Sequence, residues 1–263
     1  MRALRPLTAL LFVSASALGD PLPPRAERMF SPGRSAAAED SPESLVVNPA
    51  NIAFMHGAEA RWMGARCNDT QKIACGQALS AATPILFGLA GGFRVDYITP
   101  PPPPVGLSDY IWLTWGLAYK ISDAIAVGGT FQYAASQSPV TNGLVGFSIG
   151  TTFRPNPYLS ISAIAHDING PSNAPLLGGF ATLDRSWVMG FALRPTGRRG
   201  FEMGLDLRYL EGTTQPNGDR NDQWIPRITA GLDIPNVGRF YTFQDPQGAV
   251  ISIITPRMEG APR

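Results

Sequence analysis

Eight ionisable side chains lie at alternate positions of otherwise apolar segments, and successive residues of an extended strand point to opposite faces. They are Arg94, Asp96, Lys120, Glu202, Asp206, Arg208, Arg227 and Asp233. Alternation puts them on the face opposite the large apolar residues. Because buried charges are paired wherever a partner is available, and both signs occur here, we interpret the set as ion pairs that hold an internal segment or narrow a channel. We favour this interpretation over a charged path for a substrate, and the mixed signs argue against a strongly ion-selective pore.

Residues for catalysis or metal binding are sparse. A serine–lysine protease needs a lysine beside its nucleophilic serine, but the only lysines are Lys72 and Lys120, in a predicted loop and at a predicted strand end. His56 and His166 have no nearby Cys or His at metal-ligand spacing. Phosphate-loop, HExxH and GxSxG motifs do not occur. We therefore expect no catalytic residues, no cofactor and no metal, and a protein that is not an enzyme.

The composition is unusually poor in charge. Of 263 residues, 16% are charged, against about 25% in an average soluble domain. The 28 Gly and 13 Phe residues fit a protein whose exterior partly faces lipid. After the N-terminus no apolar run is long enough for a transmembrane helix, which needs about 18 residues or more. A formal net charge of +1 gives no reason to expect nucleic acid as a partner.

The stretch 186–211 shows which elements carry the charged residues. Large apolar residues occupy every second position on both sides of a Pro-Thr-Gly-Arg-Arg turn: Trp187, Met189, Phe191 and Leu193, then Phe201, Met203, Leu205, Leu207 and Tyr209. This alternation predicts an antiparallel hairpin. The intervening positions hold mostly Gly, Ala and a few charges, and large apolar residues outside with small or polar ones inside are typical of a narrow transmembrane β-barrel. A soluble β-sandwich with an uncrowded outer face is the alternative.

Alternation and turn chemistry extend this pattern along the chain. Twelve strands are predicted, over residues 58–65, 77–83, 86–97, 110–120, 124–134, 143–153, 158–167, 185–194, 200–211, 224–233, 238–244 and 248–255. Tight joins alternate with long ones, as periplasmic turns and external loops do in outer-membrane barrels. We predict an all-β, antiparallel, up-and-down transmembrane barrel of about 12 strands (range 10–14). Both termini then lie on the periplasmic side, with the loop between the first two strands outside.

Two further expectations depend on these faces. Aromatic residues near predicted strand ends are expected to form belts at the two membrane surfaces; they are Tyr97, Trp112, Trp115, Tyr133, Tyr158, Trp187, Tyr209 and Trp224. If Leu205 faces the bilayer midplane, Leu205→Arg is expected to cost about 2–4 kcal/mol. Gly204→Ser, on the opposite face, is expected to cost far less.

The N-terminus reads as a secretory signal over residues 1–19. Arg2 and Arg5 precede a short apolar core at 7–18, and a small-x-small site lies before Asp20. Residues 20–57 then form a lead segment that is mobile or threads the lumen, 58–255 the barrel, and 256–263 a tail. Export implies an oxidising envelope, where Cys67 and Cys75, which enclose NDTQKIA, are expected to form a disulfide. Closing so short a loop stabilises it by about 2–3 kcal/mol.

Asn48, Pro49 and Ala50 lie just before the first predicted strand. They resemble the N-terminal NPA segment of FadL/PorV-like outer-membrane barrels. The resemblance implies that this segment lies inside or beneath the barrel as a plug. It also implies contact with outer-membrane lipid in a Gram-negative envelope, and either passage of a small hydrophobic ligand or scaffolding of an envelope protein.

A longer resemblance covers VVNPANIAF, FRVDYITPPPPP, GLAYKISDAIAVGGTFQY, AIAHDINGP and FALRPTGRRGFEMGLDLRYLEG. Together these segments are similar to the barrel-like region that precedes the protease domain in some SppA-type signal peptide peptidases. Our first hypothesis is a non-enzymatic outer-membrane barrel. The alternatives are the barrel portion of such a peptidase without its catalytic domain, and a soluble periplasmic β-sandwich that binds a protein partner.

Overall fold

A computed structural model describes residues 34–65, 75–99, 108–139, 141–170, 185–197, 201–212, 222–234, 238–244 and 250–256. Two short helices come first, α1 (Ser44–Val47) and the 3-10 helix η1 (Pro49–Phe54). Twelve strands follow: β1 (Glu59–Ala65), β2 (Cys75–Pro84), β3 (Leu89–Thr99), β4 (Tyr110–Lys120), β5 (Ile125–Ser136), β6 (Val145–Asn156), β7 (Leu159–His166), β8 (Ser186–Leu193), β9 (Phe201–Leu210), β10 (Gln223–Ile234), β11 (Gly238–Gln244) and β12 (Val250–Pro256).

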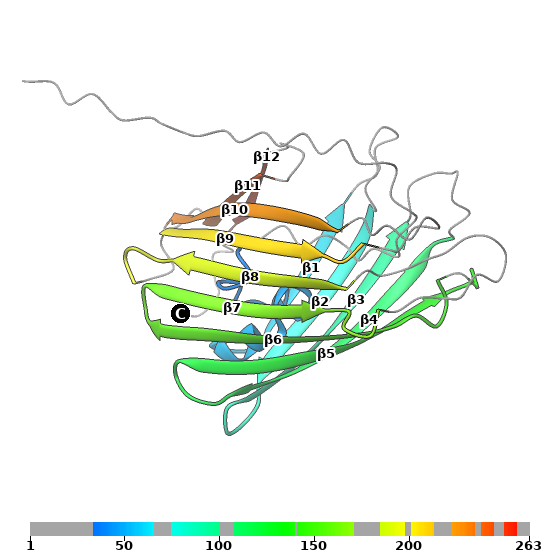
Figure 1. Cartoon of the computed structure of the whole chain (residues 1–263), viewed down its shortest axis with the longest axis horizontal. Coiled ribbons are helices and arrows are strands. Elements are labelled where there is room, and N and C mark those ends of the chain that lie inside the picture. The colour runs from blue at the N-terminus through cyan, green and yellow to red at the C-terminus, as the bar shows by residue number, and fades with distance from the viewer. Residues whose placement is uncertain are drawn as a thin grey trace, which may run out of the picture.

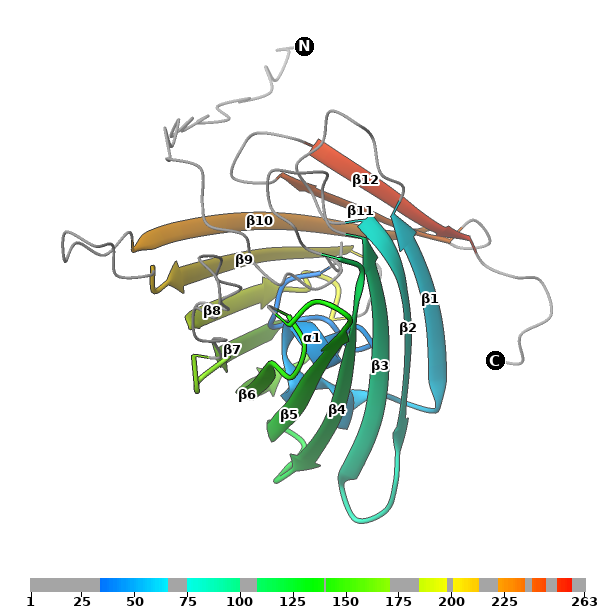
Figure 2. The same ribbon diagram turned by 90° about the vertical axis from the view of Figure 1, so that its right-hand side faces the viewer.

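The strands form a single sheet in which each pairs antiparallel with the next along the chain. The hydrogen-bonded order runs from β1 to β12, and the sheet curls around the N-terminal segment (Figures 1 and 2). This confirms the predicted all-β, antiparallel, up-and-down fold. A sandwich requires two sheets packed face to face, so the described strands do not support that alternative.

Alternation is strict in β8 and β9, where every second residue is buried over Ser186–Leu193 and over the first seven residues of β9. The exposed positions carry large apolar side chains, as predicted for the hairpin. The same outward apolar face continues around the sheet through Leu79, Phe93, Trp115, Leu117, Val127, Phe131, Phe147, Ile149, Phe153, Met189, Leu205 and Ile228. The concave face is made mostly of Gly, Ala, Ser, Thr and charged residues.

Some strand limits differ from the expectations. Leu86 and Phe87 belong to the turn between β2 and β3, not to a strand, because Leu89 N donates to Leu86 O at 3.0 Å and closes a tight turn there. Apolar residues continue into this turn, so alternation alone did not reveal where the strand ends. The strand β6 continues to Asn156 through a register shift between Phe153 and Asn156, beyond its predicted end at 153.

One aromatic residue of the predicted membrane belts has a different place. Trp112 is fully buried on the concave face, in an apolar cluster with Tyr110, Ile98 and Leu144. It alternates with the outward Ile111 and Leu113, so its phase along β4 makes it an interior residue despite its position near the strand end.

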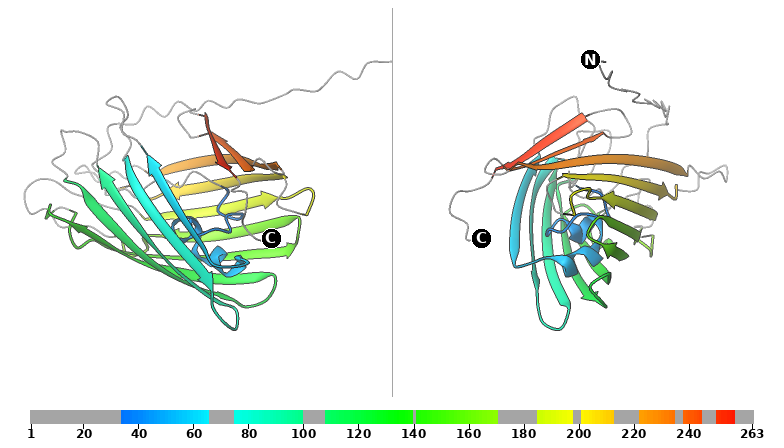
Figure 3. Two further views of the ribbon diagram at one scale, coloured as in Figure 1. Left: turned by 180° about the vertical axis from the view of Figure 1, so that it is seen from behind. Right: turned by 90° about the vertical axis from the view of Figure 1, so that its left-hand side faces the viewer.

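The segment before β1 packs against the concave face of β3 to β6 (Figures 2 and 3). Asn48 starts η1: its Oδ1 accepts from Ala50 N at 3.2 Å, and Pro49, which has no N–H to satisfy, takes the first helical position. Among the described residues, no helix is both long and apolar enough to cross a membrane.

Candidate functional site on the concave face

Glycines of the sheet make room for the N-terminal segment. A Cβ atom at Gly128 would lie 2.6 Å from the carbonyl carbon of Pro49, and one at Gly150 would lie 2.3 Å from Asn48 Oδ1. At Gly116 it would meet a Leu45 methyl at 2.3 Å. Real Cβ atoms do not come this close to other atoms, so the segment backbone lies against β5 at Gly128, and the side chains of Asn48 and Leu45 lie against β6 and β4.

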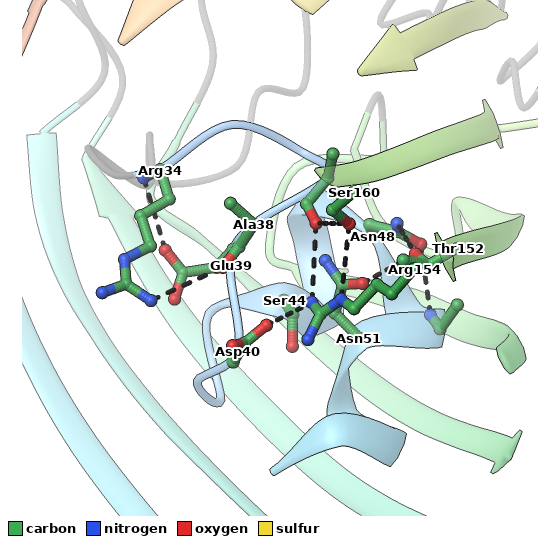
Figure 4. Close-up of polar contacts among 12 residues, drawn as sticks. Arg34, Ala38, Glu39, Asp40, Ser44, Asn48, Asn51, Thr152, Arg154 and Ser160 are labelled. Atoms are coloured by element: carbon green, nitrogen blue, oxygen red, sulfur yellow. Dashed lines mark hydrogen bonds and ion pairs between the residues drawn. The ribbon is translucent and has the colours of Figure 1, made fainter. Parts of the chain in front are cut away.

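The Asn-Pro-Ala motif is the centre of a buried amide network (Figure 4). Asn48 Nδ2 donates to Thr152 Oγ1 at 2.8 Å and to Ala36 O at 3.0 Å. Asn51 Nδ2 donates to the same carbonyl at 2.9 Å, and its Oδ1 accepts from Thr152 Oγ1 at 2.7 Å. One threonine of β6 therefore holds both asparagines, and the two asparagines hold the Ala36 carbonyl earlier in the segment.

A second contact involves a buried guanidinium. Arg94 of β3 is fully buried, with Nη2 2.6 Å from Asp96 Oδ1. Its Nη1 forms an ion pair with Glu43 of the segment, and Glu43 Oε1 accepts from Ser80 Oγ at 2.7 Å. Two carboxylates thus share one guanidinium, with one carboxylate on the sheet and one on the segment.

A third contact lies at the end of the sheet that carries the β4–β5, β6–β7 and β8–β9 turns. Asp40 forms an ion pair with Arg154 (Figure 4). Its Oδ2 also lies 3.3 Å from Arg194 Nη2. Arg194 Nε is also 2.8 Å from Glu202 Oε2, and Arg34 Nε is 3.6 Å from Glu202 Oε1. Acids and bases alternate through this chain of contacts, so each buried charge has a neighbour of opposite sign.

Asp206 of β9 holds the first described turn of the segment. It accepts from Ser35 Oγ at 2.5 Å and from Ala36 N at 3.0 Å. On its other side, Arg227 Nη2 lies 2.6 Å from Asp206 Oδ2 and donates to Arg34 O at 3.0 Å. The carboxylate therefore bonds both to a sheet cation and to the backbone of the segment.

The remaining predicted residues lie elsewhere. Lys120 Nζ is 2.7 Å from Asp123 Oδ1 at the β4–β5 turn, and this hydrogen bond, with the lysine charge, lowers the pKa of the Asp123 carboxyl. Arg208 lies further along the same face as Asp206 and is exposed. Asp233 faces Arg239 in the β10–β11 register, but its side chain lies outside the described residues. Cys67 also lies outside the described residues, so its disulfide with Cys75 stays a prediction. The signal peptide stays a prediction as well.

Sequence reasoning named both partners in only two of the ion pairs described above, Arg94–Asp96 and Arg227–Asp206. Asp40 and Glu43 come just before the NPA motif in a segment without periodicity, and Arg154 and Arg194 were assigned to a turn and a strand end. A signal was nevertheless present, because the plug resemblance of the NPA motif implies burial, and buried carboxylates need partners that neutralise them. Ordinary strand alternation does not show which arginines do so.

The arrangement is that of a docking site for the N-terminal segment. Within the described part of the chain, no group of three or more His, Cys, Asp or Glu side chains is placed to hold a metal ion. A hollow of about 330 Å³ opens beside Arg154 and Arg194, lined also by Pro155, Pro157, Leu159 and Ala124. What the site does chemically is neutralise and hydrogen-bond the N-terminal segment.

Several solved structures are similar to this chain, including the following two. A Pseudomonas aeruginosa FadL homologue has a TM-score of 0.54 at 11% sequence identity, over 80% of this chain and 77% of that chain. The Ralstonia pickettii toluene transporter TbuX has a TM-score of 0.50 at 10% identity, over 85% and 86% respectively. No protein-family model matches the sequence, and no curated protein matches it. The chain therefore has a FadL-like fold, which agrees with the fold implied by its NPA motif.

Proposed function

We propose that this chain is a non-enzymatic outer-membrane β-barrel that binds and passes a small apolar ligand. The observation that carries the proposal is the inverted sheet, with large apolar residues outward and a small, polar concave face around a docked N-terminal segment. The fold shared with a FadL homologue and a toluene transporter supports the same choice of ligand class.

Membrane insertion requires the sheet to close, because an unpaired edge cannot lie in hydrocarbon. An even number of strands makes β1 and β12 antiparallel to each other, which is the orientation that closure needs. Electrophoresis of the detergent-extracted protein, boiled and unboiled, tests this step. A heat-dependent shift in mobility is expected, whereas release from envelopes by carbonate and an unchanged mobility would overturn the barrel.

The ligand is tested separately, by uptake into cells. Cells that express the protein and cells that carry an empty vector are compared for uptake of labelled toluene and labelled glucose. We expect faster entry of toluene alone, since the proposed path is for apolar molecules. Equal toluene uptake in both cell types would contradict passage, and faster entry of both molecules would indicate a general pore.

The two other roles stay predictions. Scaffolding of an envelope protein, as in PorV-like barrels, has no described contact that favours it over ligand passage. The resemblance to the region before the protease domain of SppA-type peptidases gains no support from the FadL homologue or the toluene transporter.

A further inference from the structure

The turn between β2 and β3 has an unexpected residue at its tip. Leu89 N donates to Leu86 O, and the two central residues, Phe87 and Gly88, have φ of 55° and 81°. Positive φ at both central positions defines a type I′ turn, for which Asn-Gly is the favoured pair. Here the first central residue is phenylalanine, a bulky side chain in a region of φ that disfavours it.

The other turns of the chain follow the usual rule. Where φ is positive in them, the described residue is Gly143, Gly170, Gly197 or Asp167. Phe87 is the one large apolar residue with positive φ among those the structure describes. Backbone strain that a smaller residue would relieve points to a role for the side chain itself.

The side chains of this turn are also the most exposed apolar group of the sheet end. Ile85 is 53% exposed, Leu86 67% and Phe87 91%. Ile85 folds back over the outward face, where its Cδ1 lies 3.4 Å from the position of a Cβ on Gly91, next to Leu117. The turn projects from its end of the sheet (Figure 2).

The neighbouring β4–β5 turn shows how far the β2–β3 turn extends from the sheet. Gly88 O accepts from Lys120 N at 2.8 Å, so Phe87 extends beyond Lys120, to the level of the β4–β5 turn. That turn begins with Ile121, which is 56% exposed, and continues with Ser122 and a fully exposed Asp123. Outward Tyr119 and Leu89 lie directly beside the apolar tip. The apolar tip is therefore continuous with the outward apolar face, at the point where the neighbouring turn becomes polar.

We propose that Leu86 and Phe87 insert into the lipid leaflet on the side of the tight turns and anchor this hairpin at the boundary between headgroups and acyl chains. The proposal rests on the membrane location given above. Lipid is the occupant because the tip continues the surface that would face acyl chains, and Leu86 and Phe87 are wholly apolar and exposed. A protein partner is the competing outcome of the test.

The depth of residue 87 in the membrane is measured by tryptophan fluorescence of the protein in vesicles. Phe87→Trp is compared with Phe87→Asn, so that the difference in emission isolates the added indole from the five native Trp residues. We expect lipids brominated on the acyl chain to remove most of the added emission, and aqueous iodide to leave it. Asp123→Trp on the neighbouring turn is the matched control, and its added emission should be lost to iodide.

The urea midpoint of unfolding separates membrane anchoring by Phe87 from the intrinsic turn propensity of that position. Phe87→Asn gives the turn its preferred Asn-Gly pair, so turn propensity alone predicts a higher urea midpoint. Anchoring predicts a lower midpoint in vesicles. Iodide access at position 87, or a higher midpoint of Phe87→Asn in vesicles, would overturn the proposal. Loss of native Trp emission to brominated lipid in the same sample would show that the barrel itself is still inserted.

Discussion

Gly128 of β5 lies directly against Pro49 of the N-terminal segment, and a Cβ atom there would be 2.6 Å from the carbonyl carbon of Pro49. The next residue, Gly129, points outward, where a Cβ atom would meet only Ser148 O at 3.4 Å and a methyl of Ile149 at 3.8 Å. Of these two adjacent glycines, only Gly128 lies too close to another segment to carry a side chain. The first makes room for the docked segment, and the second lies on the outward face.

This pair gives a matched test of docking. Gly128→Ala should displace the segment and lower the free energy of unfolding by about 1–3 kcal/mol, the usual cost of overpacking a filled site. Gly129→Ala should leave the position of the segment and the free energy of unfolding almost unchanged. Urea unfolding and limited proteolysis of residues 34–57 measure the two effects, and equal results for the two variants would show that the segment is not held against β5.

The ion pair between Arg94 and Glu43 gives a larger effect. Arg94→Met removes the cation that Asp96 and Glu43 share and leaves two buried carboxylates without it, a change that costs about 3–5 kcal/mol when one partner of a buried pair is removed. The triple variant Arg94→Met, Asp96→Asn, Glu43→Gln removes the charges together and should recover part of the loss.

An exposed pair on the same sheet serves as the comparison for Arg94. Arg61 Nε lies 2.6 Å from Glu59 Oε1 on β1, and both side chains are partly exposed. Arg61→Met should change the free energy of unfolding by about 0–1 kcal/mol. If Arg94→Met costs no more than Arg61→Met, the concave side is filled with water and its charges are solvated.

The outward face is tested at Leu205. It lies in the middle of β9, between Phe191 of β8 and Ile228 of β10. Leu205→Arg should cost about 2–4 kcal/mol if that position faces the bilayer midplane. Urea unfolding in vesicles measures the cost, with Leu205→Met as the control of similar volume. A small cost for the arginine in vesicles would place this face in water.

The structure corrects the expectation for the residue next to it. Gly204→Ser was expected to cost little, because serine suits a polar face. A Cβ atom at Gly204 would lie 2.3 Å from Ser35 Cβ and 2.4 Å from Thr229 Oγ1. Gly204→Ser should therefore lower the free energy of unfolding, because Ser35 of the N-terminal segment already occupies that space.

Gly204 illustrates which features the sequence predicts and which it does not. Period-two alternation is a local property, so it revealed the strands, their faces and the inward placement of Arg94, Asp206 and Glu202. It did not reveal Asp40, Arg154 or Arg194 as partners, because their contact joins positions more than 100 residues apart through a segment with no regular structure. It also missed Phe87 as a turn residue, because apolar identity outweighed the Gly that follows it.

The remaining prediction concerns which side of the membrane each end of the sheet faces. Cys75 begins β2, at the end opposite the β2–β3 turn, and its Sγ lies 3.4 Å from Thr99 O, where β3 ends. If tight turns are periplasmic, Cys67 and Cys75 lie on the cell surface. After mild reduction of intact cells, an impermeant thiol reagent should label both residues, and Cys67→Ser/Cys75→Ser should abolish the labelling. Labelling of the native protein only after lysis would reverse the topology and place the tip at Phe87 in the outer leaflet instead.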